Sequence, residues 1–525
     1  MIRKVLLAWM IAWSVCAGIG AQKASVDARK LQIALFAISN LYVDPTNETE
    51  LVENAIEGML GKLDPHSTYM DPEETKEMNE PLQGNFDGIG IQFNMLTDTV
   101  YVIQVIPGGP SEKVGLMSGD RIIEVNDTVI AGVKMRTNDI MKRLRGPKGS
   151  EVRVKVKRGS ATDLMEFKIV RGKIPVYSLD AAYMADKHTG YIKLNRFAAS
   201  STDEFREALR ELRKQGMRNL ILDLQGNGGG YLNVAIELAD EFLDKDRLIV
   251  YTQGNRQRRE EALSTARGQF QEGRLVILVD ESSASASEIV SGAVQDWDRG
   301  VIVGRRTFGK GLVQKPIPLP DGSMIRLTVS RYYTPTGRCI QKPYESGKIE
   351  EYQHDLIDRY NRGELMSADS IHFPDSLKYN TMQSKRVVYG GGGIMPDVFI
   401  PIDTTDYSDY HRDLVSKGLV NRVAMDYLDQ HRQALTKKYK KPQTYKEKFV
   451  VTDDIMAHLR QLADEKGIAF KEEEYNRSLA LIKLQIKALI ARDLFDMTEY
   501  FYIINDVNDS YQEALKIIND EERYN

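Results

Sequence analysis

The chain has very few cysteines. Only two occur in 525 residues, Cys16 and Cys339. Cys16 lies in an N-terminal segment that we expect to be removed, so Cys339 is left alone and cannot form an intrachain disulfide. The mature protein must therefore be stabilised by its apolar cores despite an oxidising location. A chain of this length exceeds one ordinary core, which predicts about two to four domains.

The chain also lacks an excess of either charge and a long apolar run after its N-terminus. Lysine plus arginine (71) nearly balances aspartate plus glutamate (75), so we expect no nucleic-acid partner. Apolar residues make up 42% and charged residues 28%, which is typical of folded soluble domains and not of disorder. No cluster of histidines and carboxylates has the spacing of metal ligands, so we expect neither a metal nor a cofactor.

The N-terminus has the pattern of a secretory signal peptide. Positive charge in "MIRK" precedes the short apolar run "VLLAWMIAWSVCAGIG", and small residues lead to Ala21. A retained membrane anchor is the alternative, but the run falls short of the roughly 20 residues that a span needs. Val15 before Cys16 disfavours a lipoprotein. We expect cleavage after residue 21 and a periplasmic protein; association with the surface of the inner membrane stays open.

The remaining sequence divides into segments that differ in the spacing of their apolar residues. Apolar residues at helical spacing come first, short alternating runs such as "EVRVKVKRG" follow, and then continuous apolar strands alternate with helices. The last pattern predicts an α/β fold with a buried sheet. We predict an N-terminal helical segment (22–84), a small β domain (85–172), an α/β core (173–403) with a polar, irregular insertion at about 342–386, and a C-terminal helical region (404–525).

Ser285 stands between an apolar strand, "RLVILVD", and an amphipathic helix, "SEIVSGAVQDW". It precedes Glu288 by three residues, which is the spacing of a capping box, so the serine could simply cap the helix. The small residues of "SSASAS" leave its hydroxyl unobstructed, however. The N-terminus of a helix can also stabilise an oxyanion through backbone N–H groups. Both a cap and a nucleophile remain open from these residues alone.

A serine nucleophile needs a base, and the α/β core offers no histidine after Ser285 among the seven of the chain. Lys310, between two glycines in "RRTFGKGLVQ", is the other candidate. Burial can lower a lysine pKa by several units from ~10.4. Gln314 would lie roughly 13 Å away along a straight strand, at ~3.3 Å per residue, so contact requires a bend. The alternative is a surface lysine in a glycine loop.

The stretch "DLQGNGGGY" is a strand that ends in a glycine run before a helix. Such a loop could cradle phosphate, but no lysine–serine pair follows, as it does in phosphate-binding loops. It could equally offer backbone N–H groups to an oxyanion.

Together these pieces resemble the carboxyl-terminal processing peptidases, also called tail-specific proteases. "SASASE", "FGKGLVQ", "DLQGNGGG", "YYTPTGRCIQ" and "GGGGIMPDV" occur in that family's order, and "GIGIQF" with "VIPGGPSEKVGLMSGDRIIEVN" resembles its PDZ domain. The likeness runs from about Tyr42 to Pro401. It implies a crotonase/Clp-like catalytic core, an inserted PDZ domain, and helical N- and C-terminal regions.

The resemblance also implies roles for single residues. Ser285 matches the nucleophile, Lys310 the general base and Gln314 the residue that orients the lysine. The backbone of Ala286, Gly229 and Gly230 matches the oxyanion hole. The loop that receives a peptide carboxylate in PDZ domains matches Gly88, Ile89, Gly90 and Ile91.

Some positions depart from the family pattern. Gln225 and Gly228 stand where arginine and proline are usual, which leaves the conformation of the glycine loop in doubt. Asp296 matches an acidic position that we expect to be structural.

The function implied is an exported serine endopeptidase whose PDZ domain recognises substrates by apolar C-terminal tails. The partners would be protein and peptide substrates, and self-association of the chain stays open. One alternative is a non-catalytic PDZ scaffold, against which the intact Ser285, Lys310 and Gln314 argue. Another is an acyl-CoA enzyme on the related fold, which explains neither the signal peptide nor the PDZ domain.

Overall fold

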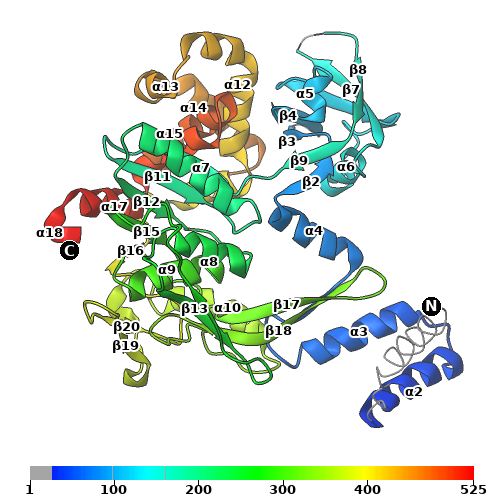
Figure 1. Ribbon diagram of the computed structural model, residues 1–525. Coiled ribbons are helices and arrows are strands. Elements are labelled where there is room, and N and C mark those ends of the chain that lie inside the picture. Colours follow the sequence, from blue (N-terminus) through cyan, green and yellow to red (C-terminus); the bar gives the residue numbers. More distant parts are fainter. Residues whose placement is uncertain (1–25, 97, 160, 525) are drawn as a thin grey trace, which may run out of the picture.

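The N-terminal segment opens the part of the chain that the computed structural model describes, residues 26–524 without 97 and 160; the predicted signal peptide (1–21) lies outside it. It contains α2 (Val26–Leu41), α3 (Glu48–Leu60), β1 (Thr68–Met70) and α4 (Pro72–Gln83). Helices α2 and α3 project from the body of the molecule (Figure 1). Asp71 and Glu74 form a capping box at the start of α4. Strand β1 was not predicted, because three residues carry no recognisable period.

The β unit follows as a sheet of six strands with two short helices. Its strand order is β3-β4-β5-β7-β8 with β6 beside β5, and all pairs are antiparallel. Alternation in β7 buries Val152, Val154 and Val156, as the sequence pattern predicts. The elements are β3 (Ile91–Leu96), β4 (Thr99–Val105), α5 (Pro110–Lys113), β5 (Asp120–Val125), β6 (Thr128–Val129), α6 (Thr137–Leu144), β7 (Glu151–Arg158) and β8 (Met165–Val170).

A two-stranded ribbon connects the β unit to the rest of the chain. Strand β2 (Asn85–Gly88) leads in from α4 and pairs antiparallel with β9 (Gly172–Pro175), which leads out. Entry and exit therefore lie side by side, which is what a domain inserted into another fold requires.

The α/β core is built on a six-stranded sheet of order β10-β11-β12-β15-β16-β21. Only the β10–β11 pair is antiparallel. Helices α7, α8 and α9 cover one face and α17 covers the other. The elements are β10 (Leu179–Met184), β11 (Thr189–Leu194), α7 (Ser201–Lys214), β12 (Asn219–Asp223), α8 (Leu232–Asp240), β15 (Leu275–Val279), α9 (Ala286–Asp296), β16 (Val301–Gly304), β21 (Val398–Phe399) and α17 (Asp509–Asn519).

A second sheet lies beside this core. Its order is β1-β18-β13-β14, and β17 pairs with β18 to form a long hairpin. Strand β1 pairs antiparallel with β18, so the N-terminal segment contributes an edge strand to this second sheet. The strands are β13 (Leu248–Gln253), β14 (Glu260–Leu263), β17 (Leu312–Pro318) and β18 (Met324–Tyr333).

The insertion is more ordered than predicted. It contains α10 (Ile349–Asn361), two single-turn helices at 368–370 and 375–377, and the hairpin of β19 (Lys378–Asn380) and β20 (Val387–Tyr389). The prediction of an irregular segment is wrong for α10, because that helix buries two polar side chains. Arg359 donates to the carbonyl oxygens of Arg306 and Thr307, and Tyr352 bonds the ring of His66.

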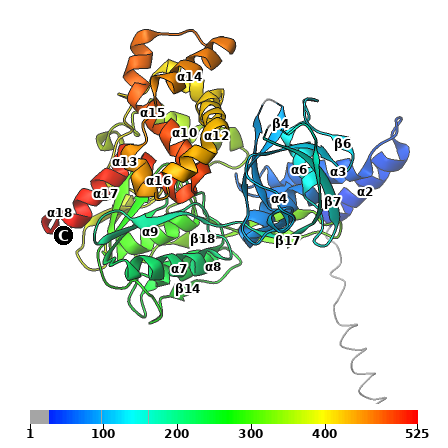
Figure 2. The same cartoon turned by 90° about the horizontal axis from the view of Figure 1, so that it is seen from above.

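The C-terminal helical region has its own apolar cluster. Its helix α12 lies beside the β unit (Figure 2). Tyr101 and Arg121 of the β unit both bond the carboxylate of Asp429 on α12. Within residues 26–524 as described, no helix is both long and apolar enough to cross a membrane. The helices are α11 (Asp409–Ser416), α12 (Leu419–Lys438), α13 (Pro442–Lys448), α14 (Asp453–Glu465), α15 (Glu472–Leu494), α16 (Met497–Ile504), then a single turn at 505–507, α17 and α18 (Glu521–Tyr524).

Candidate active site

Ser285 lies at the tight turn that joins β15 to α9. Its φ of 56° is unusual for a residue with a side chain and marks a strained backbone of the kind found at functional sites. The glycine loop runs against it, and a Cβ added to Gly229 would lie 2.8 Å from the Ser285 Cβ. Only glycine fits there, so the approach of this loop to the serine is built into the sequence.

Glu288 connects this turn to the loop that carries Lys310. Its side chain is fully buried. One oxygen accepts from the Thr307 hydroxyl (2.5 Å) and the Gly309 N–H (2.8 Å). The other accepts from the N–H groups of Ser285 (2.8 Å) and Lys310 (2.9 Å). The expected capping box is therefore present, and its carboxylate also aligns the loop of the lysine. Burial raises the pKa of Glu288 to about 7.

Lys310 is held by the packing of the glycines around it. Cβ atoms at Gly309 and Gly311 would approach neighbouring atoms to 3.1 and 2.8 Å. The buried hydroxyl of Tyr332 lies within hydrogen-bond distance of two carbonyl oxygens, those of Lys310 and Ser285. Desolvation, aided by the positive charge of Arg326, lowers the pKa of Lys310 to about 8. A substantial fraction of the lysine is therefore neutral in mildly alkaline solution.

A cavity of about 360 Å³ brings the predicted residues together. The residues that were predicted as catalytic or as part of the oxyanion hole all line it, namely Ser285, Ala286, Lys310, Gln314, Gly229 and Gly230. The register of β17 against β18 shifts between Val313 and Gln314, so the strand is irregular at the place where the spacing required a bend. The Gln314 amide nitrogen donates to the Thr328 hydroxyl at 3.2 Å, which leaves the amide oxygen to accept from another donor.

The oxyanion donors are not equivalent. The Gly229 N–H donates to the Asn227 side chain at 2.9 Å and is already used. Within the described residues, the Gly230 and Ala286 N–H groups donate to no acceptor, and both residues line the cavity. These two donors fit a developing oxyanion better than Gly229 does.

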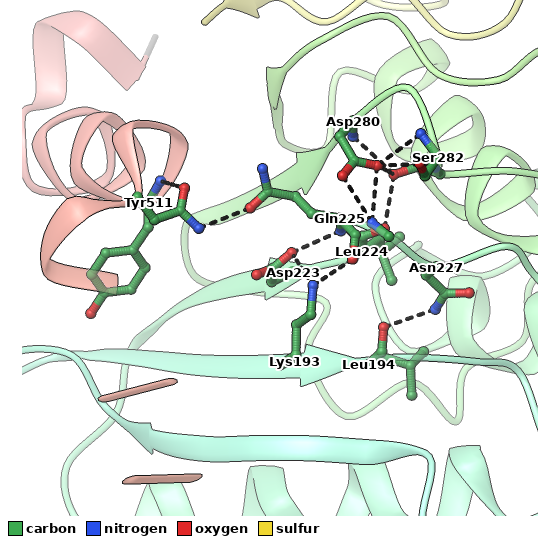
Figure 3. Close-up of polar contacts among 12 residues, drawn as sticks. Lys193, Leu194, Asp223, Leu224, Gln225, Asn227, Asp280, Ser282 and Tyr511 are labelled. Atoms are coloured by element: carbon green, nitrogen blue, oxygen red, sulfur yellow. Dashed lines mark hydrogen bonds and ion pairs between the residues drawn. The ribbon is translucent and has the colours of Figure 1, made fainter. Parts of the chain in front are cut away.

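A buried polar network supports the glycine loop from behind (Figure 3). Lys193 donates to the Asp223 carboxylate (3.0 Å) and to the Gln225 carbonyl oxygen, while the Asp280 carboxylate accepts the Gly226 N–H. The Gln225 side chain accepts from Asn508, next to α17. Gln225, which stands where the family usually has arginine, is thus held by a hydrogen bond from the C-terminal region. The expected structural role of Asp296 also fits, since it is buried and paired with Arg338.

The turn "DPHST" of the N-terminal segment reaches the same site. Asp64 accepts from the hydroxyls of Ser67 and Thr328, and Thr328 in turn bonds Gln314. His66 lies close enough to Lys310 for their charges to interact, but its ring bonds the Tyr352 hydroxyl at 2.9 Å. Burial, chiefly, lowers the pKa of His66 to about 4, so it is neutral in the pH range of interest.

The predicted carboxylate loop of the β unit precedes β3, the end strand of its sheet. Gly90 has φ 78°, and a Cβ there would lie 3.0 Å from Ile174 Cδ1. Ile89 is buried, and its carbonyl oxygen accepts the Ser111 N–H. An open strand edge beside a glycine loop is what peptide addition requires.

Three residues of this region have contacts that were not predicted from the sequence. Glu288 was considered only as a helix cap, while Tyr332 and Asp64 were not singled out. The spacing of Glu288 from Ser285 was the available signal for the first. The other two act across 47 and 264 residues of chain, to Ser285 and Thr328, and carry no local signal.

Four protein families match parts of this chain. Residues 188–350 match Peptidase family S41 and residues 88–169 match the PDZ domain. Residues 17–75 match the family "Activating protease CtpB N-terminal domain", and residues 410–496 match a family of unknown function (DUF8443).

Two relatives share over a third of the aligned residues. The carboxy-terminal processing protease CtpB of Bacillus subtilis (strain 168) is 35% identical over 322 residues, which cover 60% of this chain and 65% of the relative. The carboxy-terminal-processing protease of Bartonella bacilliformis is 36% identical over 305 residues, which cover 57% and 69%. Among solved structures, the photosystem II D1 C-terminal processing protease is 26% identical with a TM-score of 0.37, covering 72% of this chain and 88% of that one.

The family models and the two relatives define a serine-type peptidase, and the chain has mixed α and β structure. The chain belongs to Peptidase family S41, among the carboxy-terminal processing proteases, and carries a PDZ domain. The family resemblance described from the motifs is thereby confirmed.

Proposed function

We propose that the protein is an exported endopeptidase in which Ser285 is the nucleophile and Lys310 the general base. Neutral Lys310 takes the hydroxyl proton of Ser285 as its oxygen attacks the scissile carbonyl carbon. The Ala286 and Gly230 N–H groups bind the oxyanion. The lysine then gives its proton to the leaving amine, and water hydrolyses the acyl-enzyme with the lysine again as base.

The observation that carries this proposal is the environment of Lys310. Its side chain lines the cavity of Ser285, and its pKa is lowered to about 8. Within the described residues it has no ion-pair partner. A structural lysine would be expected at the surface or in a salt bridge. Gln314, whose amide nitrogen donates to Thr328 and whose amide oxygen remains available as an acceptor, would orient the ammonium group.

We further propose that the core is crotonase/Clp-like and that the PDZ domain selects substrates by apolar C-terminal tails. The open edge of β3 and the loop Gly88–Ile91 support tail binding by strand addition. The expected signal peptide supports a periplasmic location. Helix α2 exposes Leu31, Ile33 and Phe36, which supports self-association or contact with the membrane surface.

The decisive experiment compares the full-length protein with Ser285→Ala on an unstructured peptide that has an apolar C-terminus. Turnover should fall by at least about 10⁴-fold. Loss of the cap should lower the free energy of unfolding by only about 1 kcal/mol, so a folded variant is expected. Full activity of folded Ser285→Ala would disprove the assignment.

The non-catalytic scaffold is tested by the same measurement. A scaffold would bind the peptide tail equally in both proteins and hydrolyse it in neither. Binding of the tail to Ser285→Ala, measured by calorimetry, separates recognition from cleavage.

A further inference from the structure

Arg326 on β18 is an arginine without a counter-ion inside the catalytic cavity. It lines the cavity together with Ser285 and Lys310. Its Nε is buried and has no hydrogen-bond partner. One terminal nitrogen donates to the sulfur of Met78 at 3.5 Å, a weak acceptor. Within the described residues no carboxylate lies within ion-pair distance of it.

Two other buried arginines of the core, Arg338 and Arg359, also have an Nε without a hydrogen-bond partner, but their terminal nitrogens donate to oxygen acceptors. Arg338 pairs with Asp296 and also donates to the Tyr389 carbonyl oxygen, and Arg359 donates to two backbone carbonyl oxygens. Asp64 is the acidic group whose charge acts on Arg326. Its oxygens, however, already accept from Ser67, His66 and Thr328. An unpaired, partly buried guanidinium lowers the stability of the folded protein, because its charge loses water without gaining a partner. The presence of Arg326 beside Ser285 is therefore best explained by a ligand that pairs with it.

We propose that Arg326 is a substrate subsite that binds an acidic side chain close to the scissile bond. This inference rests on the proposed cleavage at Ser285 and adds a second determinant to recognition of the tail. A carboxylate matches the planar fork of the guanidinium with two parallel hydrogen bonds. Met78, Leu82 and Pro316 line the same cavity and lower the local dielectric, which strengthens such a pair.

Pairing of Arg326 with a substrate carboxylate would also change the pKa of Lys310. The positive charge of Arg326 helps to lower the pKa of Lys310, while Glu288 and Asp64 raise it and His66 is neutral. A bound substrate carboxylate neutralises part of the Arg326 charge. The pKa of Lys310 in the enzyme–substrate complex should therefore rise. For acidic substrates the pH profile of kcat should be displaced to higher pH than that of kcat/KM, which reports the free enzyme.

The test uses the full-length protein and unstructured peptides that share one apolar tail. Pairs of peptides carry Glu or Gln at one position on either side of the cleaved bond. Wild-type protein should show a KM about tenfold lower for Glu than for Gln at one of these positions. Arg326→Gln should abolish the difference, and Arg326→Lys should retain part of it. Arg331→Gln is the matched control, since Arg331 is an exposed residue of the same strand and lies outside the cavity.

Binding of the same peptides to Ser285→Ala separates this inference from the proposed function. If the Glu and Gln peptides bind with equal Kd at every position, the subsite is refuted even when all of them are cleaved. A preference for Glu that survives Arg326→Gln refutes it as well. If wild-type protein cleaves no peptide but binds Glu peptides more tightly through Arg326, the subsite stands and the catalytic assignment falls. Coinciding pH profiles of kcat and kcat/KM for the Glu peptide would overturn the coupling to Lys310.

Discussion

The turn at Ser285 and the loop at Gly90 each contain a residue with positive φ, yet the two regions are expected to depend on different parts of their residues. Around Ser285, side chains hold the backbone in place. The Glu288 carboxylate accepts four hydrogen bonds, and the Tyr332 hydroxyl contacts two carbonyl oxygens. In the loop at Gly90, the proposed ligand contacts come from backbone N–H groups. Chemistry should therefore be sensitive to side-chain identity at the first site, whereas recognition should be sensitive to backbone shape at the second.

The largest effect is expected from Lys310→Arg. Arginine cannot deprotonate, so turnover should fall by about 10²–10⁴-fold although the charge is kept. Wild-type activity should rise with pH through about 8, because the base works only after it loses its proton. The variant should show no such rise up to the pH at which the protein unfolds. Near-native turnover of Lys310→Arg would mean that another residue is the base.

The second largest effect is expected from Glu288→Gln. The amide NH₂ would face two of the N–H and O–H donors that the carboxylate now accepts, so the turn and the lysine loop would separate. We expect a loss of about 3 kcal/mol in the free energy of unfolding by urea and a loss of activity in the protein that remains folded. Glu281→Gln is the control, because Glu281 forms one partly exposed ion pair with Arg305. Equal effects of the two changes would remove the special role of Glu288.

The third effect is expected from Gly90→Ala, which changes the loop of the PDZ domain. A side chain at φ 78° costs about 1–2 kcal/mol and would press on Ile174, so the loop should shift. We expect KM for substrates with a free C-terminal carboxylate to rise about tenfold with kcat nearly unchanged. Amidated substrates should respond little to the substitution. A fall in kcat with unchanged KM would contradict the division between the two regions.

The smallest effect is expected from Tyr332→Phe. The phenyl ring keeps the packing, and only the contacts to two carbonyl oxygens are lost. Stability should fall by about 1 kcal/mol and activity by a few-fold, as measured by thermal unfolding and initial rates. Wild-type rates would show that Glu288 alone holds the turn to the lysine loop.

The difference between the two regions also explains what the sequence could predict. Local periods located the strands of the core, helix α9 and the β unit, and the motifs pointed to Ser285 and Lys310, which the structure brings to one cavity. The strand pairing of β1, the packing of α10 and the contact of Asp64 with Thr328 escaped prediction. Each of these depends on a partner far away in the chain, and such pairings leave no period in the sequence.

Helix α17 has a consequence for when the protein can act. It covers one face of the core sheet with Tyr511, Ala514, Ile517 and Ile518, and Asn508 before it bonds the glycine loop. All strands of that sheet are synthesised earlier than residues 509–519. The catalytic region is thus incomplete until this late stretch has emerged and docked. A nascent chain that has not yet reached residue 519 would therefore lack this packing and the contact of Asn508 with the glycine loop, and we expect peptidase activity to appear only after the helix has docked.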